Sequence, residues 1–201
     1  MPDEGALASL VAVTRALDTA GARFLVAGSF ASSLQGIPRS TRDVDLVADL
    51  ASHQVTTFTR ALGPDFYLDE ERIHDGVRRR ASFNVIDLRN GFKVDVYMTG
   101  EDPFGRAQFE RRQTVELRPG LELAFATAED VVLQKLRWFR LGGEVSERQW
   151  LDAVGVLRVQ GARLDRAYCE HWSAALGVAD LLARARVRAG LEPHSPLTEA
   201  G

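Results

Sequence analysis

Apolar residues recur at two different spacings in the first part of the chain, and these spacings predict alternating helices and strands. Residues 4–20 place apolar side chains at the three- and four-residue intervals of an amphipathic helix. Residues 24–27 form a short apolar run that is typical of a buried strand, and residues 29–35 predict a short helix. Strict alternation over residues 43–47 predicts a strand with one polar and one apolar face. Residues 55–62 predict another helix.

Two more strands are expected near the middle of the chain. Residues 82–88 and 92–98 are both strand-like, and Arg89-Asn90-Gly91 between them is typical of a hairpin turn. After a loop near Asp102-Pro103, residues 121–125 predict one further strand.

The pattern then becomes purely helical. Thr127 with Asp130, and Ser146 with Gln149, have the spacing of helix capping boxes. We therefore expect an α+β fold, with a small mixed β-sheet flanked by helices, and a C-terminal helical region. The expected boundaries are 1–126 for the core, 127–190 for the helical region and 191–201 for a disordered tail.

Composition narrows the class of protein. The 201 residues are 45% hydrophobic and 26% charged, which is ordinary for a soluble globular protein. No apolar run approaches the roughly 20 residues of a membrane span, and the N-terminus has no secretion signal. With the single Cys169, these features predict a cytoplasmic protein without a membrane partner. A net charge of −3 argues against a surface wholly adapted to nucleic acid.

The strand over residues 43–47 carries the first candidate chemistry. Asp43 and Asp45 alternate with apolar residues, so both carboxylates point to one face, with Cα atoms roughly 7 Å apart. Mg²⁺ prefers oxygen ligands and is commonly held by one or two carboxylates together with substrate phosphates. The alternative is a solvated edge strand, or aspartates paired with Arg39 and Arg42.

Two other segments bear on this choice. Gly28-Ser29 stands between a strand and a short helix, where glycine allows a close backbone approach and the helix N-terminus favours phosphate. Asp95 shares one face of its strand with Lys93 and Tyr97. A third carboxylate beside Asp43 and Asp45 would be costly to hold without metal, and it could act as a base for an attacking hydroxyl.

These residues resemble the nucleotidyltransferase superfamily. The resemblance rests on Gly28-Ser29-x-Ala31, on Gly36, on Arg39-x-Thr41-x-Asp43-Val44-Asp45-Leu46 and on Lys93-Val94-Asp95-Val96. It implies a nucleotidyltransferase fold in which Gly28, Ser29, Arg39 and Thr41 bind the nucleotide. Asp43, Asp45 and Asp95 are then the catalytic residues and hold Mg²⁺, with two ions expected.

The implied reaction is Mg²⁺-dependent transfer of an NMP from an NTP such as ATP, with release of pyrophosphate. The acceptor is left open: an RNA or tRNA end, a protein side chain, or a small hydroxylated molecule. The alternative is a non-catalytic nucleotide-binding or interaction module with the same fold.

Lys135 is the remaining candidate for the nucleotide site. It lies within the apolar stripe of its helix, where its ammonium either reaches the rim of the core or meets an anion. Glu129-Asp130…Lys135 and Arg148–Asp152 resemble the later motifs of AbiEii-like toxin-type nucleotidyltransferases, which are often toxins of bacterial toxin–antitoxin pairs. The resemblance implies that Lys135 reaches the nucleotide and that Asp152 lies near the site, and it offers a cognate antitoxin as a partner. The pattern of the helix favours another interpretation of Asp152. Asp152 lies off the apolar face of its helix, so we expect it to be solvated.

Arg78, Arg79 and Arg80, with Arg72, form the densest basic run. Two interpretations remain. The run either binds the phosphates of an RNA acceptor or, as is more common for such runs, forms a solvated face paired with local acids.

Overall fold

The computed structural model describes residues 4–41, 43–99 and 102–191. The chain divides into two compact units. The first holds the described residues of 1–34 and 38–127, and the second holds residues 35–37 with the described residues from 128 onward. Most of the tail expected over 191–201 lies outside the described residues. No helix in the described part of the chain combines the length and apolar character that a membrane span requires.

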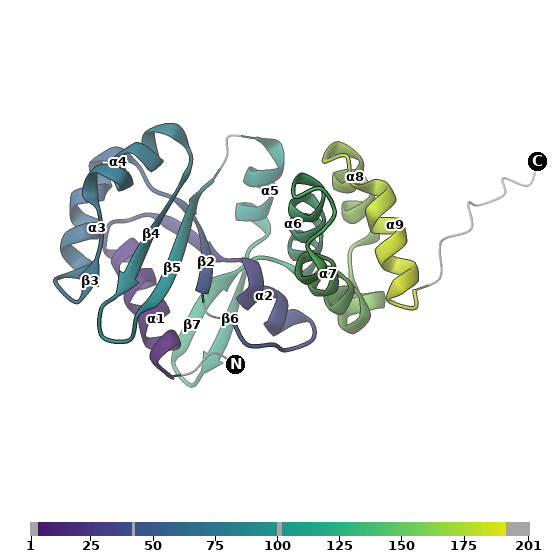
Figure 1. The fold of residues 1–201 in the computed structure, drawn as a ribbon, viewed down its shortest axis with the longest axis horizontal. Coiled ribbons are helices and arrows are strands. Elements are labelled where there is room, and N and C mark those ends of the chain that lie inside the picture. Colours follow the sequence, from purple (N-terminus) through teal and green to yellow (C-terminus); the bar gives the residue numbers. More distant parts are fainter. Residues whose placement is uncertain (1–3, 42, 100–101, 192–201) are drawn as a thin grey trace, which may run out of the picture. The chain divides into compact units, whose positions relative to one another are not determined.

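The first unit is built on one mixed seven-stranded sheet with the strand order β3-β4-β5-β2-β1-β7-β6 (Figure 1). The pairs β2–β5 and β1–β7 are parallel, and the other neighbours are antiparallel. The strands are β1 (Arg23–Val26), β2 (Asp43–Asp49), β3 (Phe66–Tyr67), β4 (Ser82–Asp87), β5 (Phe92–Met98), β6 (Gln113–Arg118) and β7 (Leu121–Phe125). The mixed sheet of the expected fold is therefore confirmed.

Helices cover the apolar face of this sheet. Along β2 and β5, alternate residues such as Val44, Leu46 and Val94 are fully buried, while the residues between them are half-buried. Phe58 of α3 meets Phe83 of β4 edge to face at 6.0 Å between ring centroids, which fixes α3 on the buried side. The helices of this unit are α1 (Glu4–Thr19), α2 (Gly28–Gln35), α3 (Val55–Leu62), α4 (Glu70–Arg79) and α5 (Pro103–Arg111), with a 3-10 turn at Ser52–Gln54.

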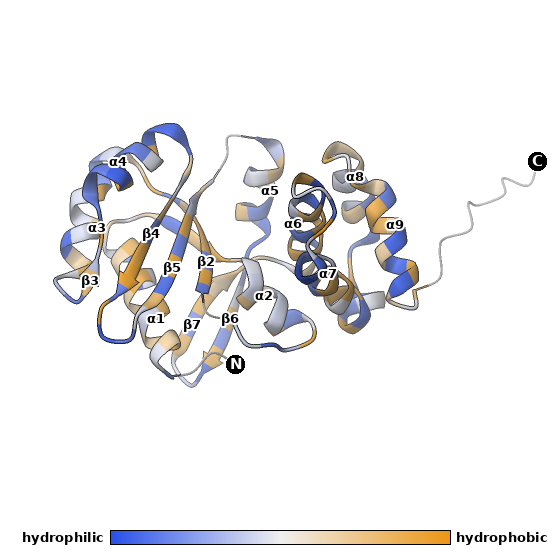
Figure 2. Ribbon diagram, in the orientation of Figure 1, coloured by the Kyte–Doolittle hydropathy of each residue, from blue (hydrophilic) through white to orange (hydrophobic). Residues whose placement is uncertain are grey.

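The sequence pattern missed four of these elements. The segment near Asp102 was expected to be a loop, but it begins α5, because the Asp102 carboxylate accepts a hydrogen bond from the Gly105 N–H at 3.0 Å and Pro103 occupies the first turn. Helix α4 begins in the same way at Asp69. It was overlooked because it is strongly hydrophilic (Figure 2). The strands β3 and β6 lie at the two edges of the sheet, where little apolar alternation is needed.

The second unit is helical, with α6 (Ala128–Leu141), α7 (Glu147–Gln160), α8 (Arg166–Ala175) and α9 (Ala179–Arg188), and a 3-10 turn at Gly161–Arg163. Helices α6 and α7 pack against each other, with the rings of Phe139 and Trp150 5.4 Å apart. The first turn of α6 also holds α8. There the Tyr168 hydroxyl donates to buried Asp130 at 2.7 Å, and the Asp165 N–H donates to Glu129 at 2.8 Å.

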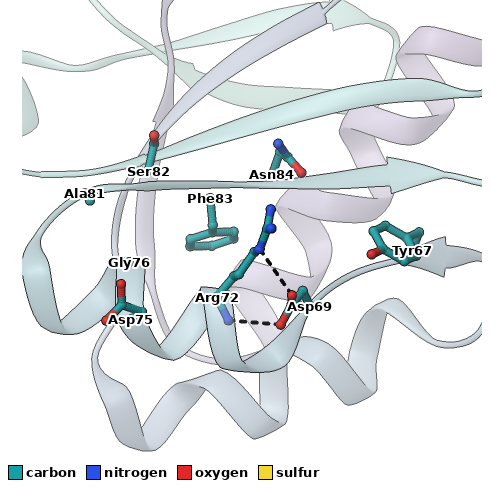
Figure 3. A pocket seen from close by; sticks show the side chains of 9 residues that line it. All are labelled: Tyr67, Asp69, Arg72, Asp75, Gly76, Ala81, Ser82, Phe83 and Asn84. Atoms are coloured by element: carbon teal, nitrogen blue, oxygen red, sulfur yellow. Dashed lines mark hydrogen bonds and ion pairs between the residues drawn. The ribbon is translucent and has the colours of Figure 1, made fainter.

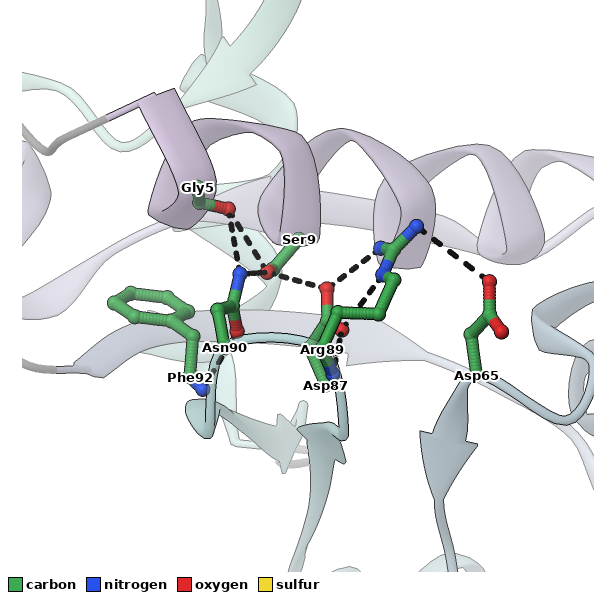
Figure 4. Close-up of polar contacts among 7 residues, drawn as sticks. All are labelled: Gly5, Ser9, Asp65, Asp87, Arg89, Asn90 and Phe92. Carbon is green, nitrogen blue, oxygen red and sulfur yellow. Dashed lines mark hydrogen bonds and ion pairs between the residues drawn. The ribbon is translucent and has the colours of Figure 1, made fainter.

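A buried carboxylate ties the β4–β5 hairpin to α1 (Figure 4). Asp87 is fully buried, and it accepts hydrogen bonds from the Arg89 guanidinium at 2.6 and 2.9 Å and from the Ser9 hydroxyl at 2.7 Å. The Arg89 hydrogen bonds, opposed by desolvation and aided by Ser9, lower the pKa of Asp87 from 3.8 to about 2. The carboxylate is therefore charged at neutral pH, and its partners stabilise that form.

Replacing Asp87→Asn is expected to lower the free energy of unfolding at pH 7 by about 2 kcal/mol, because charge-assisted hydrogen bonds in a buried site are lost. Since the folded pKa lies below the unfolded value, this contribution is complete above pH 3.8 and is lost as the pH falls through about 2. Urea unfolding of the wild type and the variant between pH 7 and pH 2 measures it. Asp65→Asn, which removes the other carboxylate near Arg89, is the exposed control.

Candidate functional site

The polar face of β2 carries Asp43 and Asp45. Both are half-buried, and the intervening Val44 and Leu46 are fully buried on the opposite face. The predicted alternation is therefore confirmed, and the two carboxylates lie on the side of the sheet away from the apolar core.

Strand β5 brings the third carboxylate to the same place. It pairs with β2 in parallel register, with Asp95 opposite Asp45 and Lys93 opposite Asp43. Residues directly opposite on neighbouring strands point to the same face, with Cβ atoms about 5 Å apart. Asp43, Asp45 and Asp95 therefore form one cluster, which we call the carboxylate cluster.

Two other side chains of β5 share this face. The Lys93 ammonium lies 2.7 Å from Oδ2 of Asp95. This hydrogen bond raises the pKa of Lys93; partial burial opposes the rise, and the charges of Asp95, Asp43 and Asp45 add to it. Burial raises the pKa of Tyr97 to about 12, with further contributions from the same three carboxylates. Lys93 is thus charged and Tyr97 neutral at physiological pH, and both lie on the face that carries the carboxylate cluster, as the alternation along this strand predicts.

The turn between β1 and α2 lies directly against Asp45. Gly28 has a φ of +57°, and a Cβ atom built there would stand 1.7 Å from Oδ2 of Asp45. The Ser29 N–H, in the first turn of α2, points to the same oxygen at 3.4 Å. Only glycine fits at position 28, because both the backbone conformation and the contact with Asp45 exclude a side chain.

Arg39 and Thr41 lie on the loop before β2 and contact the same groups. The Thr41 hydroxyl lies 3.0 Å from Oδ1 of Asp43 and 2.9 Å from its carbonyl oxygen, which orients that carboxylate. The Arg39 guanidinium donates to the Ser29 hydroxyl at 2.7 Å. Arg42, the other arginine considered as a partner of the aspartates, lies outside the described residues. Hydrogen bonds therefore link Ser29 to Asp45 and Arg39, and a separate pair links Thr41 to Asp43.

The donor set of the carboxylate cluster suits a hard cation. All three side chains offer oxygen, which Mg²⁺ prefers. Among the residues that the structure describes, no three His, Cys, Asp or Glu side chains converge closely enough to hold an ion by themselves. An ion in this site would therefore take part of its coordination from a ligand such as a phosphate.

Lys135 belongs to the second unit, where it is buried. Its ammonium lies 2.8 Å from Oδ2 of Asp152 on α7, and the two side chains are 5% and 7% exposed. The expectation that Asp152 is solvated was wrong, because the apolar pattern along one helix does not show that a cation on the neighbouring helix faces it.

The arginine run is paired with local acids. Arg78 and Arg79 both contact Asp75, at 3.1 and 2.9 Å, and Arg72 and Arg80 contact Asp69 and Asp49. Arg72 also borders a hollow of about 210 Å³ between α4 and β4 (Figure 3), whose lining residues are Tyr67, Asp69, Arg72, Asp75, Gly76, Ala81, Ser82, Phe83 and Asn84. The interpretation as a locally paired face is the one that these contacts favour.

No protein-family model and no curated protein sequence matches the chain. Solved structures do match. The solution structure of the antibiotic-resistance factor ANT(2'')-Ia is 14% identical, with a TM-score of 0.54 over 92% of this chain and 98% of that one.

Two further solved structures are similar to this chain over most of its length. The crystal structure of ANT(2'')-Ia in complex with adenylyl-2''-tobramycin is 11% identical and covers 85% of this chain and 96% of that one, with a TM-score of 0.52. An antigenic nucleotidyltransferase-like protein from Paracoccidioides brasiliensis is 17% identical over 92% of this chain and 93% of that one, also with a TM-score of 0.52. Similarity at this level of identity establishes the architecture, and the chain has the nucleotidyltransferase fold.

Proposed function

We propose that this protein is an enzyme that transfers an NMP from an NTP to an acceptor hydroxyl and releases pyrophosphate. The observation that supports it most strongly is the parallel register of β2 and β5, which sets Asp95 opposite Asp45 on the face that also carries Asp43. Three carboxylates on one face repel one another. Such an arrangement is costly for a protein that has no cation to bind there.

In this proposal Asp43 and Asp45 bind magnesium together with the triphosphate, and two ions are expected. When bound, magnesium neutralises the phosphates and stabilises the departing pyrophosphate. Gly28 lets the phosphates approach the backbone, and Ser29 at the start of α2 donates to them, with Arg39 beside it.

The reaction itself exchanges one bond for another at the α-phosphorus. The acceptor oxygen forms a bond to this atom while the bond to the bridging oxygen of the pyrophosphate breaks. The proton of the acceptor hydroxyl passes to the carboxylate of Asp95 and from there to solvent. Thr41 keeps the carboxylate of Asp43 in its orientation through the reaction.

For the acceptor we propose a small hydroxylated molecule. The fold is shared with ANT(2'')-Ia, whose complex contains adenylyl-2''-tobramycin. The paired state of Arg72, Arg78 and Arg79 also leaves the densest basic run poorly suited to RNA.

The proposal is tested by label transfer. The protein is incubated with each α-labelled NTP, Mg²⁺ and a cell extract, which is then separated into small molecules, RNA and protein. We expect Mg²⁺-dependent label in the small-molecule fraction, abolished by EDTA. Label in the RNA or protein fraction would overturn the proposed acceptor. No transfer, with NTP binding retained, would establish the non-catalytic alternative.

Lys135 is proposed to contact the nucleotide in addition to its ion pair with Asp152. Lys135→Met is expected to lower the free energy of unfolding by about 3 kcal/mol, because the buried carboxylate of Asp152 loses the ammonium that neutralises it. Asp152→Asn is the matched control, since it breaks the same pair and keeps the lysine. A nucleotide role requires that Lys135→Met loses NTP affinity in equilibrium binding while Asp152→Asn retains it; equal affinities would make the lysine purely structural.

A further inference from the structure

Lys93 is a cation built into the carboxylate cluster. It stands opposite Asp43 across the β2–β5 pair and shares the face of Asp95, two residues along the strand. Its ammonium reaches Oδ2 of Asp95 at 2.7 Å, while its side chain is 42% exposed and that of Asp95 is 16% exposed. The ammonium is therefore held at the cluster but keeps access to water.

The electrostatics of the cluster explain why a cation belongs there. The negative charges of Asp43, Asp45 and Asp95 repel one another unless positive charge lies close by. The Lys93 ammonium contacts Asp95 directly, and Lys93 stands opposite Asp43 in the strand register, so its positive charge lies beside the whole cluster. One positive charge nevertheless balances only part of three negative charges.

The choice of lysine is also informative. Only two of the 25 basic residues of this chain are lysines, and one of them is Lys93. Arginine can hold a carboxylate with two parallel hydrogen bonds, whereas lysine is a point charge on a flexible stem. A partly exposed lysine pair is thus the easier one to break when a stronger cation arrives.

We propose that Lys93 is the resident counter-ion of the carboxylate cluster in the nucleotide-free protein, and that magnesium displaces its ammonium from Asp95. This inference rests on the proposed function, because the displacing ion is the one that nucleotidyl transfer requires. It makes Lys93 a positioning residue: the lysine keeps the three carboxylates together before the ion arrives, and its departure frees the Asp95 oxygen for the acceptor proton.

The test measures Mg²⁺ binding by isothermal titration calorimetry without nucleotide. Lys93→Met removes the competing charge and is expected to lower the Mg²⁺ dissociation constant by about fivefold, the upper end expected for a partly exposed ion pair. Lys93→Arg is expected to raise it, because a two-pronged guanidinium is harder to displace. Arg15→Met removes an exposed positive charge from α1 and is expected to leave the constant unchanged.

The Asp95→Asn variant shows whether Lys93 competes with Mg²⁺ for Asp95 or only changes the net charge of the protein. In Asp95→Asn the ammonium has lost its anchor, so adding Lys93→Met is expected to change Mg²⁺ affinity less than it does in the wild type. Thermal denaturation of each variant checks that it is folded.

Equal or weaker Mg²⁺ binding by Lys93→Met, tighter binding by Lys93→Arg, or no Mg²⁺ binding by any variant would overturn the inference. Label transfer by the wild type is scored separately. If Lys93→Met binds Mg²⁺ more tightly but the wild type transfers no label, nucleotidyl transfer is refuted while the counter-ion role stands.

Discussion

Asp45→Asn is expected to lower the rate of NMP transfer by about 10²- to 10³-fold, the effect of removing one group that stabilises charge in the transition state. Asp45 is the carboxylate at the centre of the site: it faces Asp95 on β5, and the Ser29 N–H points to one of its oxygens. The asparagine keeps the shape of the side chain but removes its negative charge. The rate is measured with α-labelled NTP at saturating Mg²⁺, and Mg²⁺ affinity is expected to fall with it.

Asp49→Asn provides a matched control for this substitution. Asp49 lies on β2 and on the same face as Asp45, but it pairs with Arg23 at 2.7 Å and with Arg80 at 3.4 Å. We expect turnover by Asp49→Asn to stay within about twofold of the wild type, since surface substitutions away from a site have small effects. Equal turnover by Asp45→Asn and Asp49→Asn would contradict the assignment of Asp45 to the site.

Gly28→Ala is expected to damage both the fold and the site. The added Cβ would stand 1.7 Å from Oδ2 of Asp45, so either the β1–α2 turn or the carboxylate must move. The φ of +57° adds the backbone strain of an L-residue in a left-handed conformation. We expect the free energy of unfolding to fall by about 2 kcal/mol and the transfer rate to fall by about 10²-fold, as follows from misplacing a catalytic group by about 1 Å.

Gly120→Ala separates the effect of backbone strain from the effect of the collision with Asp45. Gly120 has a φ of +77°, but an added Cβ would meet nothing within 4 Å. It therefore carries backbone strain without the collision, and we expect about 1 kcal/mol of destabilisation with an unchanged transfer rate. Urea unfolding and label transfer on both variants give the comparison. Normal turnover by Gly28→Ala would show that the contact with Asp45 does not matter for the reaction.

Much of the core could be predicted because its signals are local. The alternation of polar and apolar residues over Asp43–Val47 indicates that one face of a strand is buried, and five residues are enough to show it. The Arg89-Asn90-Gly91 turn has the chemistry of a hairpin, and Asp87 of β4 is indeed opposite Phe92 of β5. The helices missed at Asp69 and Asp102 also carried local signals, namely capping aspartates, but the first helix is strongly hydrophilic and the second has weak apolar periodicity.

The burial of charged groups could not be predicted in this way. Asp87 is fully buried because α1 supplies the Ser9 hydroxyl and the hairpin supplies Arg89. Asp152 is buried because Lys135 on the neighbouring helix neutralises it. Neither partner can be identified from the position of the aspartate in its own helix or strand.

The sequence by itself determined the alternating strands, the glycine turn at Gly28 and the presence of carboxylates on polar strand faces, because each depends on the stereochemistry of a few consecutive residues. Only the tertiary structure decided that Asp95 stands beside Asp45, and that Lys93 supplies the charge between the strands. Parallel pairing of β2 with β5 is a long-range choice, made by packing the apolar faces of both strands under the helices. Register then follows from that packing, since a shift of β5 by one residue would turn Lys93 and Asp95 into the core.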